Sequence, residues 1–317
     1  MTAHITTTYS NQQPLPKTYS FDGKGVTTFR LIWSKQIKAL GGKNAYATFK
    51  ENSHTSGISD NHFAFHLFGE LLFLHEGEKA FSICDTTNAY ACYHGFTTKA
   101  IKTNGLRVLK KIDQECIKEF KSSDTGCRHG IGHGLLEYFG PRNLDKALEA
   151  CSTIQATHIL GCTQGVFMEF DFPGMTSPSG NAAAIRRLSS NDPYNPCNTL
   201  NKSYQLSCYF EIIQLWDQIF EKNYEKIGTL CMQLKEREEQ VACFLGAGRA
   251  AAGMSGGNIL LTQSRCSLMP NNDAFLHCHA GAYWYYSATT DAAGMKEFCT
   301  DPKLDPQECR EKVALIY

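Results

Sequence analysis

Apolar residues recur at helical spacing in pairs of short segments along most of the chain. In one such unit, an amphipathic segment over 143–151 is followed by a turn-rich stretch over 152–161 and a second helical segment over 162–170. The same unit recurs as 109–116 with 127–138, 224–231 with 243–252, and 259–266 with 278–286. We therefore predict an all-α protein made of antiparallel helix pairs, each with a first helix A and a second helix B.

Cysteines mark the length of this repeat. The cysteine that opens helix B recurs every 35 residues within two series, and 46 residues separate the series (162 to 208). Each has a partner 8 to 12 positions upstream, and the zinc hooks C-x2-C and C-x4-C are absent, so we predict disulfides rather than metal thiolates. Each would join the end of helix A to the start of helix B and stabilise the fold by about 2–3 kcal/mol. The pairs are Cys84 with Cys92, Cys116 with Cys127, Cys151 with Cys162, Cys197 with Cys208, Cys231 with Cys243, Cys266 with Cys278 and Cys299 with Cys309.

The 35-residue period is typical of an α-solenoid, a right-handed superhelix of stacked helix pairs. Over residues 59–317 the period, the helix-pair unit and the cysteines resemble Sel1-like and tetratricopeptide repeats, particularly the disulfide-stapled Sel1-like proteins. The resemblance implies a concave face, lined by A or B helices, that commonly binds peptides. We predict an N-terminal helical cap over 18–58, with an amphipathic helix over 27–40 that ends at Gly41-Gly42, and a disordered segment over 1–17.

Glycine recurs at one position of helix B. Five of the six B helices begin Cys-x-x-Gly, and the sixth has Glu211 instead of glycine. Because glycine in a first helical turn costs up to about 1 kcal/mol relative to alanine, its recurrence indicates that the backbones of neighbouring B helices approach closely. The alternative is that glycine merely tolerates the turn next to the disulfide.

The repeat places the histidines on one face. Counted from the cysteine that opens helix B, His94, His129 and Gln164 stand at position +2 and His133 at +6. The helix that precedes Cys84 has no opening cysteine. Because Cys116 follows Cys92 by 24 residues, we place the start of this earlier helix 24 residues before Cys84, at Asp60, so that His62 stands at +2 and His66 at +6. Two helices then read H-x3-H-x3-E, with Glu70 and Glu137 at +10, and residues four apart share a helix face. We predict that five side chains converge on one region: His62, His66, His94, His129 and His133.

Histidine pairs at i and i+4 are helical metal chelates, so we predict a transition-metal site. Neither pair has the glutamate that follows the first histidine in H-E-x-x-H zinc enzymes. We favour copper or iron as the bound metal, and zinc is also compatible with imidazole ligands. Neighbouring helices pack about 8–10 Å apart, so one ion can collect all five histidines only on a tightly concave face. Two ions are the alternative, with His94 between a His62–His66 pair and a His129–His133 pair. Glu70 and Glu137 are candidate catalytic residues, as ligands or as acceptors for imidazole N–H groups, and Glu169 is a further candidate for that role. Gln164 is a candidate for orienting substrate or water.

Positions +2 and +6 carry no histidine in the later repeats. They become Phe210, Gln214, Leu245, Arg249, Ala280 and Trp284. We predict that Arg249, Phe210 and Trp284, with Glu169, form a substrate site in which the guanidinium holds a carboxylate. The alternative is that these residues are inter-helix core. The 171–181 insertion is rich in turn formers and is either a flap over the metal or a passive surface loop.

Composition limits partners and compartment. The formal net charge is zero, which does not favour nucleic acid or an anionic membrane as partner. No apolar stretch reaches the roughly 18 residues of a membrane span. Fourteen paired cysteines indicate an oxidising compartment, so we expect a secreted, periplasmic or extracellular protein whose export signal or anchor lies outside this sequence.

The function expected from these patterns is that of an exported metal-dependent oxidoreductase. Copper or iron would activate dioxygen for oxidation of a peptide or a small carboxylate. Two alternatives remain open from the sequence. One is a non-catalytic metal-binding or peptide-binding repeat protein, and the other is a metallohydrolase with a metal-bound water.

Overall fold

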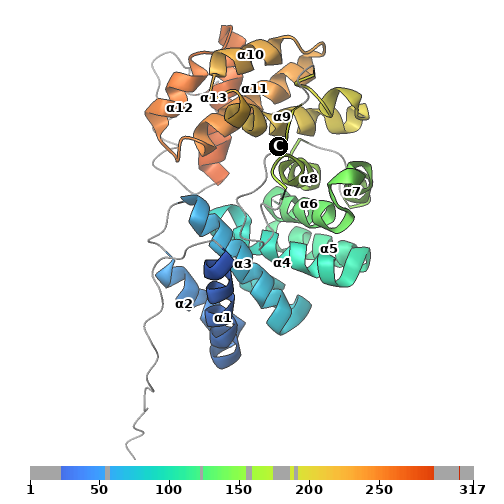
Figure 1. Cartoon of the computed structure of the whole chain (residues 1–317), viewed down its shortest axis with the longest axis vertical. Helices are drawn as coiled ribbons and strands as arrows, with labels where there is room; N and C mark the ends of the chain where they lie inside the picture. Colours follow the sequence, from blue (N-terminus) through green and yellow to red (C-terminus); the bar gives the residue numbers. More distant parts are fainter. Residues whose placement is uncertain are drawn as a thin grey trace, which may run out of the picture.

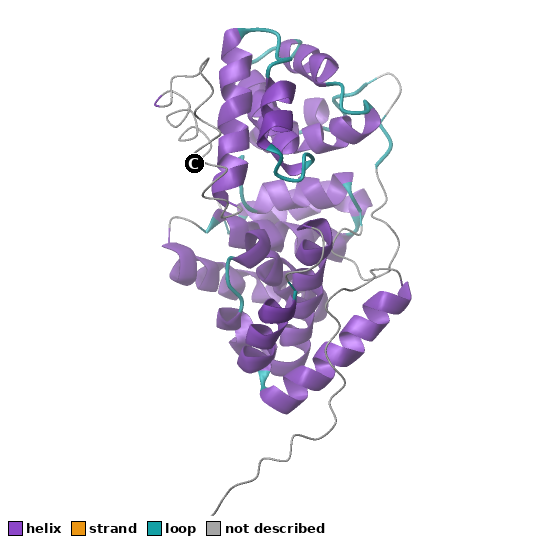
Figure 2. Cartoon of the chain, turned by 90° about the vertical axis from the view of Figure 1, so that its left-hand side faces the viewer, coloured by secondary structure: helices purple, strands orange, loops and turns teal. Residues whose placement is uncertain are grey.

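The chain is all-helical in the computed structural model, which describes residues 23–53, 58–121, 124–154, 159–173, 186–188, 192–288 and 307 (Figure 1). These residues contain no β-strand element, and the view turned by 90° shows only helices and the loops that connect them (Figure 2). The α-helices are α1 (Gly23–Leu40), α2 (Gly42–Asn52), α3 (Ile58–Glu76), α4 (Thr87–Asn104), α5 (Leu109–Phe120), α6 (Thr125–Phe139), α7 (Leu144–Ser152), α8 (Cys162–Asp171), α9 (Lys202–Ile219), α10 (Tyr224–Met232), α11 (Arg237–Gly253), α12 (Ile259–Cys266) and α13 (Asn272–Ala288). Short 3-10 helices are η1 (Gly77–Ile83), η2 (Gly105–Val108), η4 (Pro141–Asn143) and η5 (Cys197–Thr199).

Six of the predicted disulfides are confirmed. They join cysteines 8 to 12 positions apart, and no described cysteine is free. Four of them join helix A to helix B, in the pairs α5 with α6, α7 with α8, α10 with α11, and α12 with α13. In the other two, Cys84 follows η1 and Cys197 begins η5, so a 3-10 helix precedes the bridge. The predicted Cys299–Cys309 pair lies outside the described residues.

The B helices pack against one another in chain order. Contacts join α3 to α4, α4 to α6, α6 to α8, α8 to α9, α9 to α11 and α11 to α13. The A helices α5, α7, α10 and α12 pack each against its own B helix. In Figure 1 the blue-to-green helices form the lower part of the molecule, and the yellow-to-orange helices form the upper part. The molecule therefore has one series of B helices with the A helices attached to it.

The recurrence of glycine at the same position of the B helices reflects contact between their backbones. A Cβ atom on Gly95 would lie 1.8 Å from the carbonyl oxygen of His66. A Cβ on Gly165 would lie 1.9 Å from the carbonyl oxygen of His129, and one on Gly281 would lie 1.9 Å from that of Leu245. No real side chain fits at such distances, because they are far below van der Waals contact. The predicted close approach of neighbouring B helices is therefore correct, and mere tolerance of the turn does not explain these glycines.

The same contacts correct our alignment of the first histidine helix. The glycine at +3 packs against the residue at +2 of the preceding B helix, as Gly165 does against His129. Gly95 packs against His66, so His66, rather than His62, occupies +2 in α3. His62 therefore precedes that position by one helical turn. The alignment through Cys84 failed because η1 and an eight-residue bridge replace the usual helix A before α4.

Glu211 stands where the other B helices have glycine, and it is fully buried in α9. Its carboxylate accepts hydrogen bonds from Arg249 Nη1 at 2.8 Å and from Gln214 Nε2 at 2.7 Å. Among successive B helices, α8 and α9 make the least extensive contact. Glu211 therefore lies at the junction between the two parts of the series, α3 to α8 and α9 to α13.

Helices α1 and α2 cover one side of α3. Trp33 packs edge-on against Phe49 and Phe68, with ring centroids 5.1 Å and 5.5 Å away. The predicted helix over 27–40 is confirmed within α1, and it ends before Gly41, which has a φ of 75°. The domain division at residue 58 stays a prediction. The segment 1–17 lies outside the described residues, as does most of the 171–181 insertion.

Candidate metal centre

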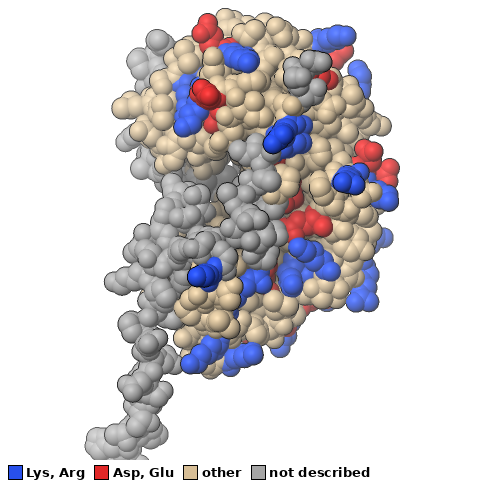
Figure 3. All heavy atoms as spheres, viewed as in Figure 1, with Lys and Arg blue, Asp and Glu red and all other residues tan. Residues whose placement is uncertain are grey.

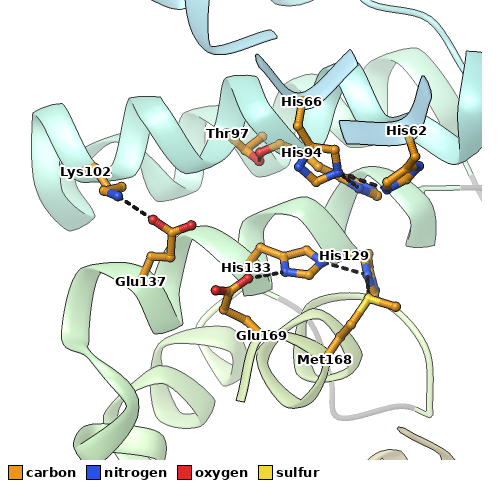
Figure 4. Close-up of polar contacts among 10 residues, drawn as sticks. All are labelled: His62, His66, His94, Thr97, Lys102, His129, His133, Glu137, Met168 and Glu169. Atoms are coloured by element: carbon orange, nitrogen blue, oxygen red, sulfur yellow. Dashed lines mark hydrogen bonds and ion pairs between the residues drawn. The ribbon is translucent and has the colours of Figure 1, made fainter. Parts of the chain in front are cut away.

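Five histidine side chains from α3, α4 and α6 lie together in the interior (Figure 4). His66 Nε2 lies 2.9 Å from His62 Nε2 and 3.3 Å from His94 Nδ1. On α6, His133 Nε2 lies 3.0 Å from His129 Nε2. The two groups adjoin, since ring centroids are 5.1 Å apart for His94 and His129 and 6.2 Å apart for His66 and His133. The predicted convergence is thus present, and side chains of the two outer helices meet across α4.

Contacts on the outer side of three rings fix which nitrogen faces inward. His62 Nδ1 donates to the carbonyl oxygen of Asn88 at 2.8 Å, and His94 Nε2 donates to that of Gly126 at 3.1 Å. His133 Nδ1 lies 3.0 Å from a carboxylate oxygen of Glu169. Each acceptor holds the ring proton on the outer nitrogen, so the lone pair of the other nitrogen points into the cluster. Metal-binding histidines are commonly oriented by such acceptors.

The acceptor for His62 belongs to an unusual backbone segment. Asn88, Ala89 and Tyr90 at the start of α4 have φ values of 52°, 52° and 63°. Left-handed geometry costs non-glycine residues roughly 1–2 kcal/mol each. This turn presents the Asn88 carbonyl to His62. Strained backbone of this kind is often found at functional sites.

The cluster favours neutral imidazoles. Burial lowers the pKa of His62 to about 4, and burial together with the neighbouring imidazoles lowers the pKa values of His66, His94 and His129 well below 6.5. Since a protonated imidazole cannot bind a metal, these shifts keep the rings in the form that a metal requires. The cluster is therefore ready to bind a cation near neutral pH without first losing protons.

His62, His66 and His94 could hold one metal ion. One ligand atom from each lies within 4.8 Å of the other two, and His66 and His94 are buried. His129 and His133 form a second pair directly beside them (Figure 4). The arrangement divides the histidines into three and two, so it resembles our two-ion alternative, with His94 assigned to the first group.

One side chain at this site was missed by the sequence analysis. Met168 Sδ, from α8, lies 3.3 Å from His129 Nε2 and is half-buried (Figure 4). Met168 stands at +6, directly after Thr98 and His133 in that row. Its place at +6 is a signal that the sequence contains, but an apolar side chain on a helix is usually interpreted as part of the hydrophobic core.

The carboxylates predicted for catalysis are engaged by basic side chains. Glu70 is buried and pairs with Arg30 of α1, and Glu137 pairs with Lys102 of α4 (Figure 4). Burial raises the pKa of Glu70 to about 7, although Arg30 opposes that shift. Glu169, placed above in the substrate site and also named as a candidate acceptor for an imidazole N–H, contacts His133. Gln164 is buried in α8 and lies near enough to His129 to favour its protonated form.

Three of the residues predicted to bind substrate, Arg249, Phe210 and Trp284, lie together in the second part of the series. Arg249 lies over the Phe210 ring at 5.5 Å, and Phe210 meets Trp284 edge-on at 5.9 Å. Phe210 is fully buried in a small apolar cluster, as the core alternative requires. Arg249 pairs with Glu211, retains 9% exposure of its side chain, and is close enough to lower the pKa of His129.

Comparison of the chain with protein families, with curated proteins and with solved structures gave no match. None of the described helices combines the length and apolar character that crossing a membrane requires. On the face drawn in Figure 3, basic and acidic side chains are intermingled. Function must therefore be argued from the histidine cluster itself.

Proposed function

We propose that the chain is a metal-dependent oxidoreductase whose histidine cluster binds copper or iron. The observation that carries this proposal is the convergence of five imidazoles, three of which have outer nitrogens fixed by oxygen acceptors. A bound redox metal would supply one-electron exchange with dioxygen or another oxidant. The protein would contribute the fixed rings, their burial and the exclusion of bulk water.

Copper is favoured over iron by what surrounds the rings. Carboxylate ligands shift metal preference toward iron or manganese, but Glu70, Glu137 and Glu169 are engaged by Arg30, Lys102 and His133. All described cysteines are in disulfides. The donor set is therefore imidazole, which suits copper, zinc, iron and nickel, without a carboxylate ligand to shift the preference toward iron.

Two other functions use the same site. A zinc ion at His62, His66 and His94 with a bound water would make a metallohydrolase, since three protein ligands and an open position are typical of catalytic zinc. A closed coordination shell would instead make a structural or storage site in a peptide-binding repeat protein. The burial of His66 and His94 favours a structural or storage site, because buried ligands restrict access to the metal.

For the substrate we propose a peptide or a small carboxylate that reaches the cluster beside Arg249. The charge of Arg249, which contributes to the lowered pKa of His129, supports this assignment. A substrate carboxylate would compete with Glu211 for the guanidinium, because Glu211 already occupies Nη1. We also propose that the helix pairs form a right-handed α-solenoid and that the protein is exported, since six disulfides need an oxidising environment.

Metal analysis of protein purified without a histidine tag tests the proposal. The protein should carry copper or iron, or bind it on titration, and His66→Ala should lower the affinity by at least about 100-fold because His66 is the shared neighbour of two other ligands. His75→Gln is the matched control, because His75 lies on the same helix outside the cluster. Oxygen consumption with peptide and carboxylate substrates then separates an oxidase from a storage site. Retention of wild-type metal affinity by His66→Ala would refute the proposal.

A further inference from the structure

We propose that His129, His133 and Met168 form a separate copper(I) subsite beside the three-histidine subsite. The inference rests on the proposed function and adds a ligand and an oxidation state to it. The second subsite would have two nitrogen donors and one sulfur donor, whereas the first has three nitrogen donors.

The geometry of this subsite centres on His129 Nε2. That atom lies 3.0 Å from His133 Nε2 and 3.3 Å from Met168 Sδ. Glu169 fixes the outer nitrogen of His133, so the His133 lone pair faces the same point as the thioether. If the proton of His129 is on Nδ1, the lone pair of His129 Nε2 becomes the third metal-binding lone pair, beside those of His133 Nε2 and Met168 Sδ. Figure 4 shows these three side chains converging from α6 and α8, below the His62, His66 and His94 group.

The chemistry of the donors selects the ion. Thioether sulfur is a soft ligand that favours copper(I), whereas zinc and iron(II) gain little from it. Met168 contributes no charge, and the two imidazole side chains beside it, His129 and His133, are buried. A monovalent ion therefore costs less to bury there than a divalent one. The pair His129 and His133 alone would not distinguish these metals.

The surroundings support a binding role for Met168 rather than simple packing. The side chain is half-buried, unlike the neighbouring Phe167, which is 1% exposed. Part of the Met168 side chain is therefore exposed, as a side chain packed wholly in the core would not be. The two subsites adjoin through His94 and His129, whose ring centroids are 5.1 Å apart. Electrons could then pass between two dissimilar copper ions within one buried cluster.

Anaerobic titration with copper(I), against a chromophoric copper(I) chelator, tests the subsite. The wild type should bind two equivalents, and copper-edge X-ray absorption should show a sulfur neighbour. Met168→Leu should lose that sulfur neighbour and bind one equivalent at least about 10-fold more weakly. Met254→Leu, at a half-buried methionine that follows α11, should behave like the wild type. Labelling with selenomethionine should replace the sulfur neighbour by selenium, and this neighbour should vanish in Met168→Leu.

The outcomes separate this inference from the proposed function. If Met168→Leu keeps both equivalents at wild-type affinity, or keeps the sulfur neighbour, the thioether subsite is refuted and the three-histidine site stands. If the wild type binds one copper ion that His94→Ala removes and Met168→Leu does not affect, the second subsite is likewise refuted. If the wild type binds no transition metal at all, the proposed function fails as well.

Discussion

The two parts of the B-helix series share a scaffold and differ in chemistry. In α3, α4, α6 and α8, two rows of equivalent positions carry four of the five clustered histidines, Gln164 and Met168, and His62 lies one helical turn before the first row. In α9, α11 and α13 the same rows carry Phe210, Leu245, Ala280 and Trp284 around one buried ion pair. Disulfides and helix-packing glycines occur in both parts. The scaffold therefore does not determine the chemistry, and the side chains in two rows decide it.

The largest effect should come from filling the helix contacts. Gly165→Ala and Gly281→Ala would each place a methyl group 1.9 Å from a carbonyl oxygen, so we expect each to lower the free energy of unfolding by about 3 kcal/mol or more. Chemical denaturation measures this loss. Gly253→Ala is the control, because its nearest neighbour is a Tyr285 ring atom at 3.3 Å. Sensitivity in only one part of the molecule would contradict the shared scaffold.

The next effect concerns the ion pair that replaces a glycine contact in the second part. Glu211→Ala leaves the Arg249 guanidinium without its partner in a buried position and should cost about 3 kcal/mol. The double variant Glu211→Ala with Arg249→Leu should recover most of that loss, because no buried charge remains. Denaturation midpoints of the three proteins measure the difference. If the double variant is no more stable than Glu211→Ala, the pair does not act as a unit.

Acidification should destabilise the histidine part of the metal-free protein. His62 has a folded pKa of about 4, below its ordinary value of 6.5, so the unfolded chain binds more protons between those pH values. The stability from this group is present above pH 6.5 and is lost as the pH falls toward 4, by at most about 3 kcal/mol. Glu70, with a raised pKa of about 7, contributes the opposite slope between pH 4.5 and 7.

Melting temperatures of wild type and His62→Gln across this pH range measure the difference. The variant should lose less stability on acidification than the wild type, because it lacks one titrating ring. Equal losses in both proteins would show that His62 is protonated as readily in the folded state as in the unfolded state.

The smallest effect should come from the acceptor behind His133. Glu169→Gln keeps an oxygen acceptor but removes its charge, so metal affinity should fall by roughly 10-fold, at the low end for residues that orient ligands. Asp217→Asn changes a buried carboxylate in α9 that accepts from Tyr224, and it should leave metal affinity unchanged. Calorimetric titration of both variants decides whether the effect is confined to the histidine part.

The sequence predicted the helices and the histidine cluster because both follow local rules. Six cysteine pairs and the 35-residue period marked the B helices, and the rows then placed His94, His129 and His133 on one face of neighbouring helices. Where no cysteine opened the helix, as in α3, the alignment was wrong by one turn. The period alone therefore aligns only helices that carry its marker.

Other features depended on contacts between distant residues. Arg30 pairs with Glu70 across 40 positions, and Lys102 pairs with Glu137 across 35. No local pattern assigns these partners, so the sequence analysis gave both glutamates to catalysis. Met168 was overlooked because its sulfur acquires a possible role only beside His129, 39 positions away. Non-local pairing thus decides which polar side chains are available to the site.

The short span of the disulfides bears on how the protein is made. Twelve cysteines that form bridges between neighbours only 8 to 12 positions apart can pair soon after both have left the ribosome or translocon. At about 5–20 residues per second, the second cysteine of a pair follows the first by roughly 0.4–2.4 s. Eight cysteines already allow 105 pairings, and sequential oxidation avoids nearly all of that search. Such a chain should mature with little need of a disulfide isomerase.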